Sequence, residues 1–153
     1  MEEHGLSLHI VSSPDDWKAM HHIRRTILFV RGRLGEVTYD ENHPDDLAPD
    51  NLPFLLRLNG RNIGVARLDL KGDNAVMRLV AIDAGEQARG HGRVLNALIE
   101  DEAKGRGLKT LLVNAAPTAV GFYEKTGWER FTWNASELAG IASDCIQMRK
   151  RLD

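Results

Sequence analysis

The chain has 153 residues, of which 42% are hydrophobic and 27% charged, and its net charge is -2. These values predict a single globular domain over residues 1–153 and give no electrostatic reason to expect nucleic-acid binding. The one cysteine, Cys145, has no second thiol to pair with, and we find neither a signal peptide nor an apolar run of roughly 20 residues that would span a membrane. We therefore expect a cytoplasmic protein without a membrane partner.

The first predicted elements are a strand over residues 6–11 and a helix that starts at Ser13-Pro14, since proline suits the first helical position. The apolar residues that follow recur mostly at helical spacing: Trp17, Met20, Ile23, Ile27, Phe29 and Val30. The pairs His21-His22 and Arg24-Arg25 fall between these positions, so a solvated helix face is predicted there. Adjacent helix residues point about 100° apart, and a metal site at the two histidines is therefore not expected.

Residues 31–52 are the least regular stretch, because glycines and prolines break the periodicity. The stretch is also acidic, with Glu36, Asp40, Glu41, Asp45, Asp46 and Asp50. One interpretation is a solvated loop with a single helical turn. The other is a lid of carboxylates over a site for a cationic acceptor, since loops longer than ~15 residues in compact domains are often functional.

Three antiparallel strands are predicted next. Residues 54–58 and 63–70 flank Asn59-Gly60, which is a strong signal for a hairpin turn. A second turn over residues 71–74 leads to a strand over 75–83 that is apolar enough to be buried on both faces.

A glycine-containing turn, Gln87-Ala88-Arg89-Gly90-His91-Gly92, joins this strand to a helix that starts at His91 and ends near Gly105. Backbone N–H groups at a helix start lack intrahelical partners and can face an anion. Gly90 and Gly92 let the backbone approach a ligand closely, and Arg89 and Arg93 add positive charge. The turn therefore predicts a pyrophosphate site. It is neither a Walker A loop nor a dinucleotide fingerprint, because the Gly-Lys-Ser/Thr and the third glycine are missing.

The last third of the chain predicts a short strand, a helix and a final pair of strands, over residues 110–113, 117–127, 129–133 and 145–152. A helix between the strands over 75–83 and 110–113 makes these two strands parallel. The complete order predicts an α/β fold with a mixed, mostly antiparallel sheet and helices packed on it.

Three motifs resemble those of the GCN5-related N-acetyltransferases, the GNAT family. Gln87-x-Arg89-Gly90-x-Gly92 is similar to the pyrophosphate motif of that family, Q/R-x-x-G-x-G/A. Residues 119–128 are similar to its A-x-x-F-Y-E-K-x-G-F ending, with Trp128 in place of phenylalanine. Residues 64–68 and 78–82 look like a G-x-A-R-L and R-V-A-V pair in small bacterial members with undefined acceptors. The resemblance implies a V-shaped splay between two parallel central strands, with helices on both faces of the sheet.

The resemblance also implies acetyl-CoA as co-substrate, with pantetheine lying in the splay and bonded to backbone groups of Val80 and Ile82. Tyr123 would be the general acid, since a phenol with a pKa near ~10 carries its proton at neutral pH. Asn114 could bond pantetheine or cap a turn. The implied cofactor contacts are Val80, Ala81, Ile82, Gln87, Ala88, Arg89, Gly90, His91, Gly92, Arg93, Asn114, Phe122 and Tyr123.

The general base is where the sequence departs from the family. Histone-type members carry a catalytic glutamate at the position of Val76, and a hydrocarbon side chain cannot accept a proton. Candidates elsewhere are Glu41, His43, Asp83 or a chain of water molecules to bulk solvent. No metal is expected in the reaction.

The favoured function is transfer of the acetyl group of acetyl-CoA to a small amine or an exposed protein amine, by direct attack in a ternary complex. Three alternatives stay open: an acyl-CoA-binding module that has lost catalysis, an acyltransferase for a longer or acidic acyl group, and a structural protein whose turn binds nothing. A homodimer would cover the edge strand that this fold leaves.

Overall fold

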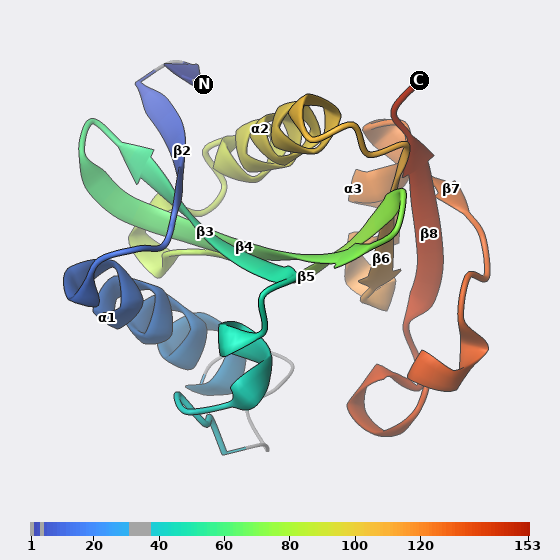
Figure 1. Cartoon of the computed structure of the whole chain (residues 1–153), viewed down its shortest axis with the longest axis horizontal. Coiled ribbons are helices and arrows are strands. Elements are labelled where there is room, and N and C mark those ends of the chain that lie inside the picture. The colour runs from blue at the N-terminus through green and yellow to red at the C-terminus, as the bar shows by residue number, and fades with distance from the viewer. Residues whose placement is uncertain (1, 4, 31–37) are drawn as a thin grey trace.

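The computed structural model describes residues 2, 3, 5–30 and 38–153. Its described strands form one sheet of eight strands, and every neighbouring pair is antiparallel except β5 and β6 (Figure 1). In sheet order the strands are β1 (Glu2–Glu3), β2 (Leu6–Ile10), β3 (Asn51–Leu58), β4 (Arg61–Lys71), β5 (Asn74–Ile82), β6 (Thr110–Ala115), β8 (Ile146–Arg151) and β7 (Glu129–Arg130). The predicted mixed, mostly antiparallel sheet is confirmed.

Helices cover both faces of this sheet, with α1 on one face and α2 on the other (Figure 1). The helices are α1 (Pro14–Ile23), which continues as the π-helical segment η1 (Arg24–Val30), α2 (His91–Gly105) and α3 (Val120–Lys125). Ser13 caps α1 as predicted: its Oγ accepts from the Asp16 backbone N–H at 3.1 Å, and the Asp16 carboxylate accepts from the Ser13 N–H at 3.3 Å. Such a cap stabilises a helix by about 1 kcal/mol.

The core is divided by the sheet into two clusters, because successive strand residues point to opposite faces. Along β3, Phe54 packs into the α2-side cluster with Leu98 and Leu111, whereas its neighbour Leu55 packs into the α1-side cluster with Met20. None of the helices in the described ranges is long and apolar enough to cross a membrane.

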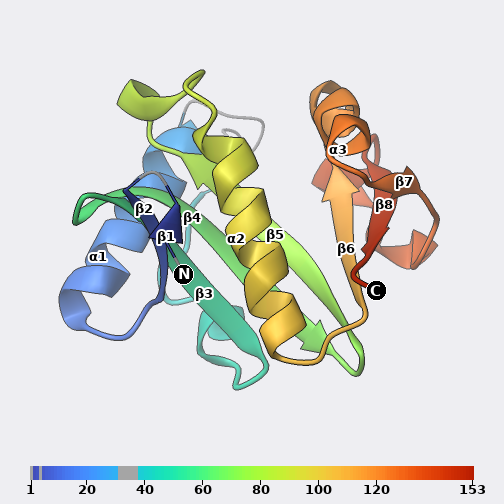
Figure 2. The same cartoon turned by 90° about the horizontal axis from the view of Figure 1, so that it is seen from above.

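The parallel strands β5 and β6 pair over only three rungs, which end at Val76 opposite Leu112. Beyond this rung the strands diverge, and the start of α2 lies at the open end of the gap (Figure 2). A bulge lies on the other edge of β5, where the register with β4 shifts, and Leu79 adopts a positive φ of 53°. Positive φ is costly for a residue with a branched side chain, so the bulge is a strained feature that the fold maintains. The implied V-shaped splay is confirmed, whereas the bulge was not predicted.

The predicted hairpin at Asn59-Gly60 is confirmed, and both residues have the positive φ that this turn needs. The predicted strand over 129–133 is wrong beyond Arg130. The backbone N–H groups of Trp133 and Asn134 donate to the side-chain Oε1 of Gln147, both at 2.9 Å, so a side chain replaces the strand ladder and the chain leaves the sheet. Two 3-10 turns follow, over Ala135–Glu137 and Gly140–Ala142.

Candidate functional site

The turn before α2 has the geometry of an anion site. Ala88 and Gly90 have positive φ values of 63° and 83°, and Gly90 is the residue that precedes the first helical turn without offering a side-chain cap. The first N–H groups of α2 therefore have no intrahelical acceptor. A Cβ built on Gly90 or Gly92 would meet no atom within 4 Å, so the surface over these N–H groups is open.

The side chains around this turn hold it in place rather than fill it. Gln87 donates from Nε2 to the Ile82 carbonyl at 2.9 Å, which links the turn to the end of β5. The Glu86 carboxylate pairs with Arg61 at 2.9 Å and His91 at 3.3 Å. The Arg61 hydrogen bond is the main reason that the pKa of Glu86 lies below its ordinary value. Arg89 and Arg93 are exposed, so their charges remain available to an anion.

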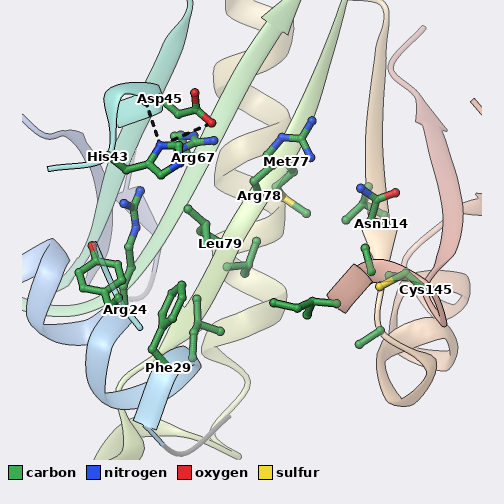
Figure 3. A pocket seen from close by; sticks show the side chains of 18 of the residues that line it. Arg24, Phe29, His43, Asp45, Arg67, Met77, Arg78, Leu79, Asn114 and Cys145 are labelled. Atoms are coloured by element: carbon green, nitrogen blue, oxygen red, sulfur yellow. Dashed lines mark hydrogen bonds and ion pairs between the residues drawn. The ribbon is translucent and has the colours of Figure 1, made fainter. Parts of the chain in front are cut away.

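A cavity of about 630 Å³ opens where β5 and β6 separate. Its walls come from Met77–Val80 of β5 and Val113–Ala115 of β6, directly beyond the last paired rung, together with η1, parts of residues 38–46 and residues near 141–145. Figure 3 shows Arg24, His43 and Arg67 on one side of this cavity and Asn114 and Cys145 on the other, with Leu79 between them.

Three of the residues implied for the cofactor line this cavity: Val80, Asn114 and Tyr123. Ala81 is buried and Ile82 is half-buried next to Val80, whereas Phe122 is 39% exposed and stacks edge-on against Tyr123. Burial alone raises the pKa of the Tyr123 phenol to about 12. Tyr123 therefore keeps its proton throughout the neutral range, and no charge or hydrogen bond among the described residues offsets the effect of burial.

Glu137 bridges the two strands at the point where they part. Its carboxylate accepts from both Nη atoms of Arg78 on β5, at 2.9 and 3.0 Å, and from Nδ2 of Asn114 on β6 at 3.0 Å. Arg78 and Asn114 each lie two residues beyond the last rung, so a side chain joins the strands where the backbone ladder has ended. Nε2 of Gln147 donates to Oδ1 of Asn114 at 3.0 Å. The Asn114 amide is thus engaged by Glu137 and Gln147.

The Glu137 bridge is one end of an alternating series of charges, which we call the ion-pair chain. Its members are Arg24, Asp46, Arg67, Asp69, Arg78 and Glu137, joined in that order by contacts of 2.7–3.0 Å. Burial would raise the pKa of Asp46, but the charges and hydrogen bonds of Arg24 and Arg67 outweigh it and hold that pKa below its ordinary value. Removing one partner from a buried pair of this kind costs about 3–5 kcal/mol.

Arg24 corrects the prediction of a solvated helix face, because it is only 1% exposed. The α-helix ends at Ile23 and continues as a π-helix, and this wider turn changes the angle between successive side chains. Arg24 consequently points inward, where Asp46 compensates its charge at 2.8 Å.

His21 also departs from the predicted solvated face. Its Nδ1 bonds the Tyr39 hydroxyl, which lines the cavity. Burial is the largest cause that lowers the pKa of His21, and burial likewise raises the pKa of Tyr39. At neutral pH the phenol is therefore the donor and the neutral imidazole the acceptor.

The acidic stretch contains the expected helical turn, a 3-10 turn over Pro44–Leu47. The solvated-loop prediction is wrong for Asp46, which is 6% exposed and paired with two arginines. Glu41 is bound by Arg25, and Asp40 accepts from the Asn42 backbone N–H. Asp40, Glu41 and Asp46 therefore bind groups of the protein itself, while Glu36 lies outside the described residues.

Of the three candidate bases, His43 lines the cavity, whereas Glu41 and Asp83 are not among its lining residues. The His43 Nδ1 accepts from the Asp45 backbone N–H at 3.2 Å, so the neutral ring carries its proton on Nε2 and presents a donor. Val76, at the position of the histone-type glutamate, is fully buried between its strand neighbours. Among the described residues, no group of three metal-binding side chains gathers.

Sequence reasoning missed the ion-pair chain and the bulge at Leu79. One signal was available: Arg67, Asp69 and Arg78 interrupt strands that are otherwise apolar, and a charge in a buried strand needs a partner. The sequence offered no means of matching these residues with Asp46 or Glu137, because the partners are far apart along the chain.

Comparison with known proteins adds a family and a fold. Residues 36–152 match the acetyltransferase (GNAT) domain model. A Lactobacillus plantarum protein assigned as an N-acetyltransferase is 21% identical with a TM-score of 0.79, covering 97% of this chain and 99% of its own. The ribosomal-protein-S18-alanine N-acetyltransferase of Escherichia coli is 22% identical with a TM-score of 0.74, over 97% and 94% of the two chains. The PaiA N-acetyltransferase of Thermoplasma acidophilum, in complex with coenzyme A, is 14% identical with a TM-score of 0.68, over 95% and 99%. The search of curated proteins gives no match.

Proposed function

Because the chain belongs to the GNAT acetyltransferase family, we propose that it transfers the acetyl group of acetyl-CoA to an amine. The observation that carries this proposal is that two features lie at the same end of the central strands β5 and β6. The open start of α2 lies at the wide end of the β5–β6 splay (Figure 2). The cavity beyond the last rung is lined by Tyr123, which keeps its proton at neutral pH. A GNAT relative of the same fold binds coenzyme A, which agrees with this arrangement.

The residues present fit the proposed co-substrate. The N–H groups at the start of α2, with Arg89 and Arg93 beside them, would hold the pyrophosphate. Backbone groups of Val80 and Ile82 would bond pantetheine in the splay, since β6 no longer occupies that edge of β5. When bound, acetyl-CoA supplies the acyl group as a thioester.

Within this site Tyr123 would act as the general acid toward the leaving sulfur. Its phenol keeps its proton at neutral pH and lines the cavity, so it can donate to a developing negative charge. The amine must lose a proton as well, and His43 presents an N–H rather than a lone pair. A route through water to the open mouth of the cavity is the remaining candidate for that proton.

One observation favours the alternative of an acyl-CoA-binding module without catalysis. Val76 has a fully buried hydrocarbon side chain at the position where histone-type members of the family carry a catalytic glutamate. Two measurements separate the possibilities. Calorimetry with CoA should give binding at micromolar strength, about −8 kcal/mol. Release of CoA from acetyl-CoA should then depend on an added amine. Binding without amine-dependent release in a broad amine panel would favour the non-catalytic module, and absence of binding would exclude both.

A further inference from the structure

Arg24 has hydrogen-bond donors that find no well-placed acceptor in the described part of the chain. Its side chain is 1% exposed, and Nη1 donates to both oxygens of Asp46 at 2.9 and 2.8 Å. Nε and Nη2 are buried and make no hydrogen bond of normal geometry with the residues that the structure describes. Arg24 lies beside the Tyr39 hydroxyl, and its hydrogen-bonding interaction with that phenol works against the rise of the Tyr39 pKa on burial. Buried polar atoms are nearly always bonded, so these donors mark a place where another acceptor belongs.

The ion-pair chain explains why that acceptor should be an anion. At one end of the ion-pair chain, the Glu137 carboxylate accepts hydrogen bonds from Arg78 and from the Asn114 amide. At the other end, Arg24 pairs with Asp46, which is its one carboxylate partner within residues 2, 3, 5–30 and 38–153 and is shared with Arg67. The series is therefore satisfied at its negative end and left open at its positive end, where Arg24 borders the cavity.

From this asymmetry we propose that the acceptor is a small molecule with a carboxylate as well as an amine, an amino-acid-like compound, and that Arg24 binds the carboxylate. The inference rests on the proposed function, because it names the substrate class of the same site. The Nε–Nη2 edge of a guanidinium is a planar fork that matches the two oxygens of a carboxylate. The clamp of Asp46 on Nη1 holds that fork in one orientation before a ligand arrives.

The position of Arg24 suits such an acceptor. Arg24 lines the same cavity as Val80 and Tyr123, so the proposed carboxylate site and the splay belong to one continuous space. A volume of about 630 Å³ lies within the range of small-molecule sites. The hypothesis of a cationic acceptor is narrowed here to a zwitterion, since Asp46 and Glu41 are paired with arginines and Asp40 accepts from a backbone N–H.

The first test uses the wild-type protein with saturating acetyl-CoA and measures CoA release. The probes are the free L-amino acids, the carboxamide of each, and the polyamines spermidine and putrescine. We expect kcat/KM for the best amino acid to exceed that of its carboxamide by roughly 10–100-fold, the effect of losing a hydrogen-bonded charge pair. Equal or better turnover of carboxamides or polyamines would overturn the proposal while leaving acetyl transfer intact.

The second test compares Arg24→Gln and Arg24→Lys with Arg25→Gln as a matched control. Arg25 is the next residue, but its side chain is 43% exposed and pairs with Glu41. Arg24→Gln should lose the preference for carboxylates, whereas Arg24→Lys should retain part of that preference because lysine keeps a point charge. Both variants should keep CoA affinity, and the Arg25 variant should keep the preference and the affinity. Unchanged preference in Arg24→Gln would overturn the assignment of Arg24.

A third measurement does not need turnover or a folded variant. The wild-type protein with CoA is titrated with N-acetyl amino acids and with their carboxamides, and the thermal midpoint is recorded. Stabilisation by the acids and not by the amides is expected. Failure of the acids to bind better than the amides would overturn the inference even if no acceptor is acetylated, and failure to bind CoA at all would overturn the proposed function as well.

Discussion

The two sides of the splay are built from different kinds of interaction. On the α2 side, a short continuous segment, residues 87–93, presents backbone N–H groups over an open surface. On the opposite side, the ion-pair chain gathers side chains from η1, the loop before β3, β4, β5 and the 3-10 turn at 135–137. The first arrangement depends on local conformation, whereas the second exists only when distant segments have packed together. We therefore expect mutations on the α2 side to weaken ligand binding and mutations in the ion-pair chain to lower the stability of the fold.

The largest effect should come from a change on the α2 side that leaves the fold intact. Gly92→Glu places a negative charge over the first helical turn, where like charges would cost several kcal/mol, and CoA affinity should fall at least about 100-fold. Gly105→Glu is the matched control, because it puts the same side chain at the other end of α2 with equal space around Cβ. Calorimetry showing unchanged CoA affinity in the Gly92 variant would contradict the pyrophosphate site.

Tyr123→Phe should give the next largest effect, now on chemistry alone. The change deletes only the donor, so kcat should fall by roughly 10–10³-fold while CoA affinity stays within a few-fold. Burial is the cause of the raised Tyr123 pKa, and the hydroxyl makes no hydrogen bond with the residues that the structure describes, so the thermal midpoint should hold. A wild-type kcat in this variant, with chemistry shown to be rate-limiting, would mean that Tyr123 is a packing residue of the core and not the general acid.

On the ion-pair side, Glu137→Ala should reduce stability rather than act on one ligand. Arg78 and Asn114 would each lose an acceptor, and we expect a loss of about 1–3 kcal/mol in the free energy of unfolding, measured by urea titration. Glu129→Ala is the control, because Glu129 is an exposed carboxylate paired with Arg149 on the outer strands. Equal losses in both variants would mean that the bridge across the splay adds nothing beyond a surface ion pair.

The smallest expected effect is a dependence on pH. The pKa of Asp46 is lowered from 3.8 in the folded state, so its ionised form contributes stability above about pH 4 that is lost as the pH falls through the folded pKa. The difference in free energy of unfolding between the wild type and Asp46→Asn should therefore be constant near neutral pH and shrink below pH 4. Urea titrations from pH 7 to pH 3 that show a constant difference would contradict the role of the ion pairs.

The same contrast separates the features that sequence reasoning could predict from those that it could not. The turn at Gln87–Gly92, the cap at Ser13 and the hairpin at Asn59-Gly60 follow from local rules, and the structure has the predicted geometry at each. The failures include the strand beyond Arg130, the solvated face at His21 and Arg24, and the solvated loop at Asp46. Beyond Arg130, the backbone N–H groups of Trp133 and Asn134 donate to the Gln147 side chain instead of a strand. At Arg24, a π-helical turn changes the direction of the side chain.

By itself, the amino-acid sequence determined the order of strands and helices, the family and the position of the glycine turn, because these depend on contacts between residues close together in the chain. Tertiary structure alone decided where β5 and β6 part, which charges meet in the ion-pair chain, and that Arg24 keeps donors with no well-placed acceptor among the described residues. The physical reason is burial. A charge removed from water must be compensated, and the identity of its partner is set by which distant segments the core brings within hydrogen-bond distance.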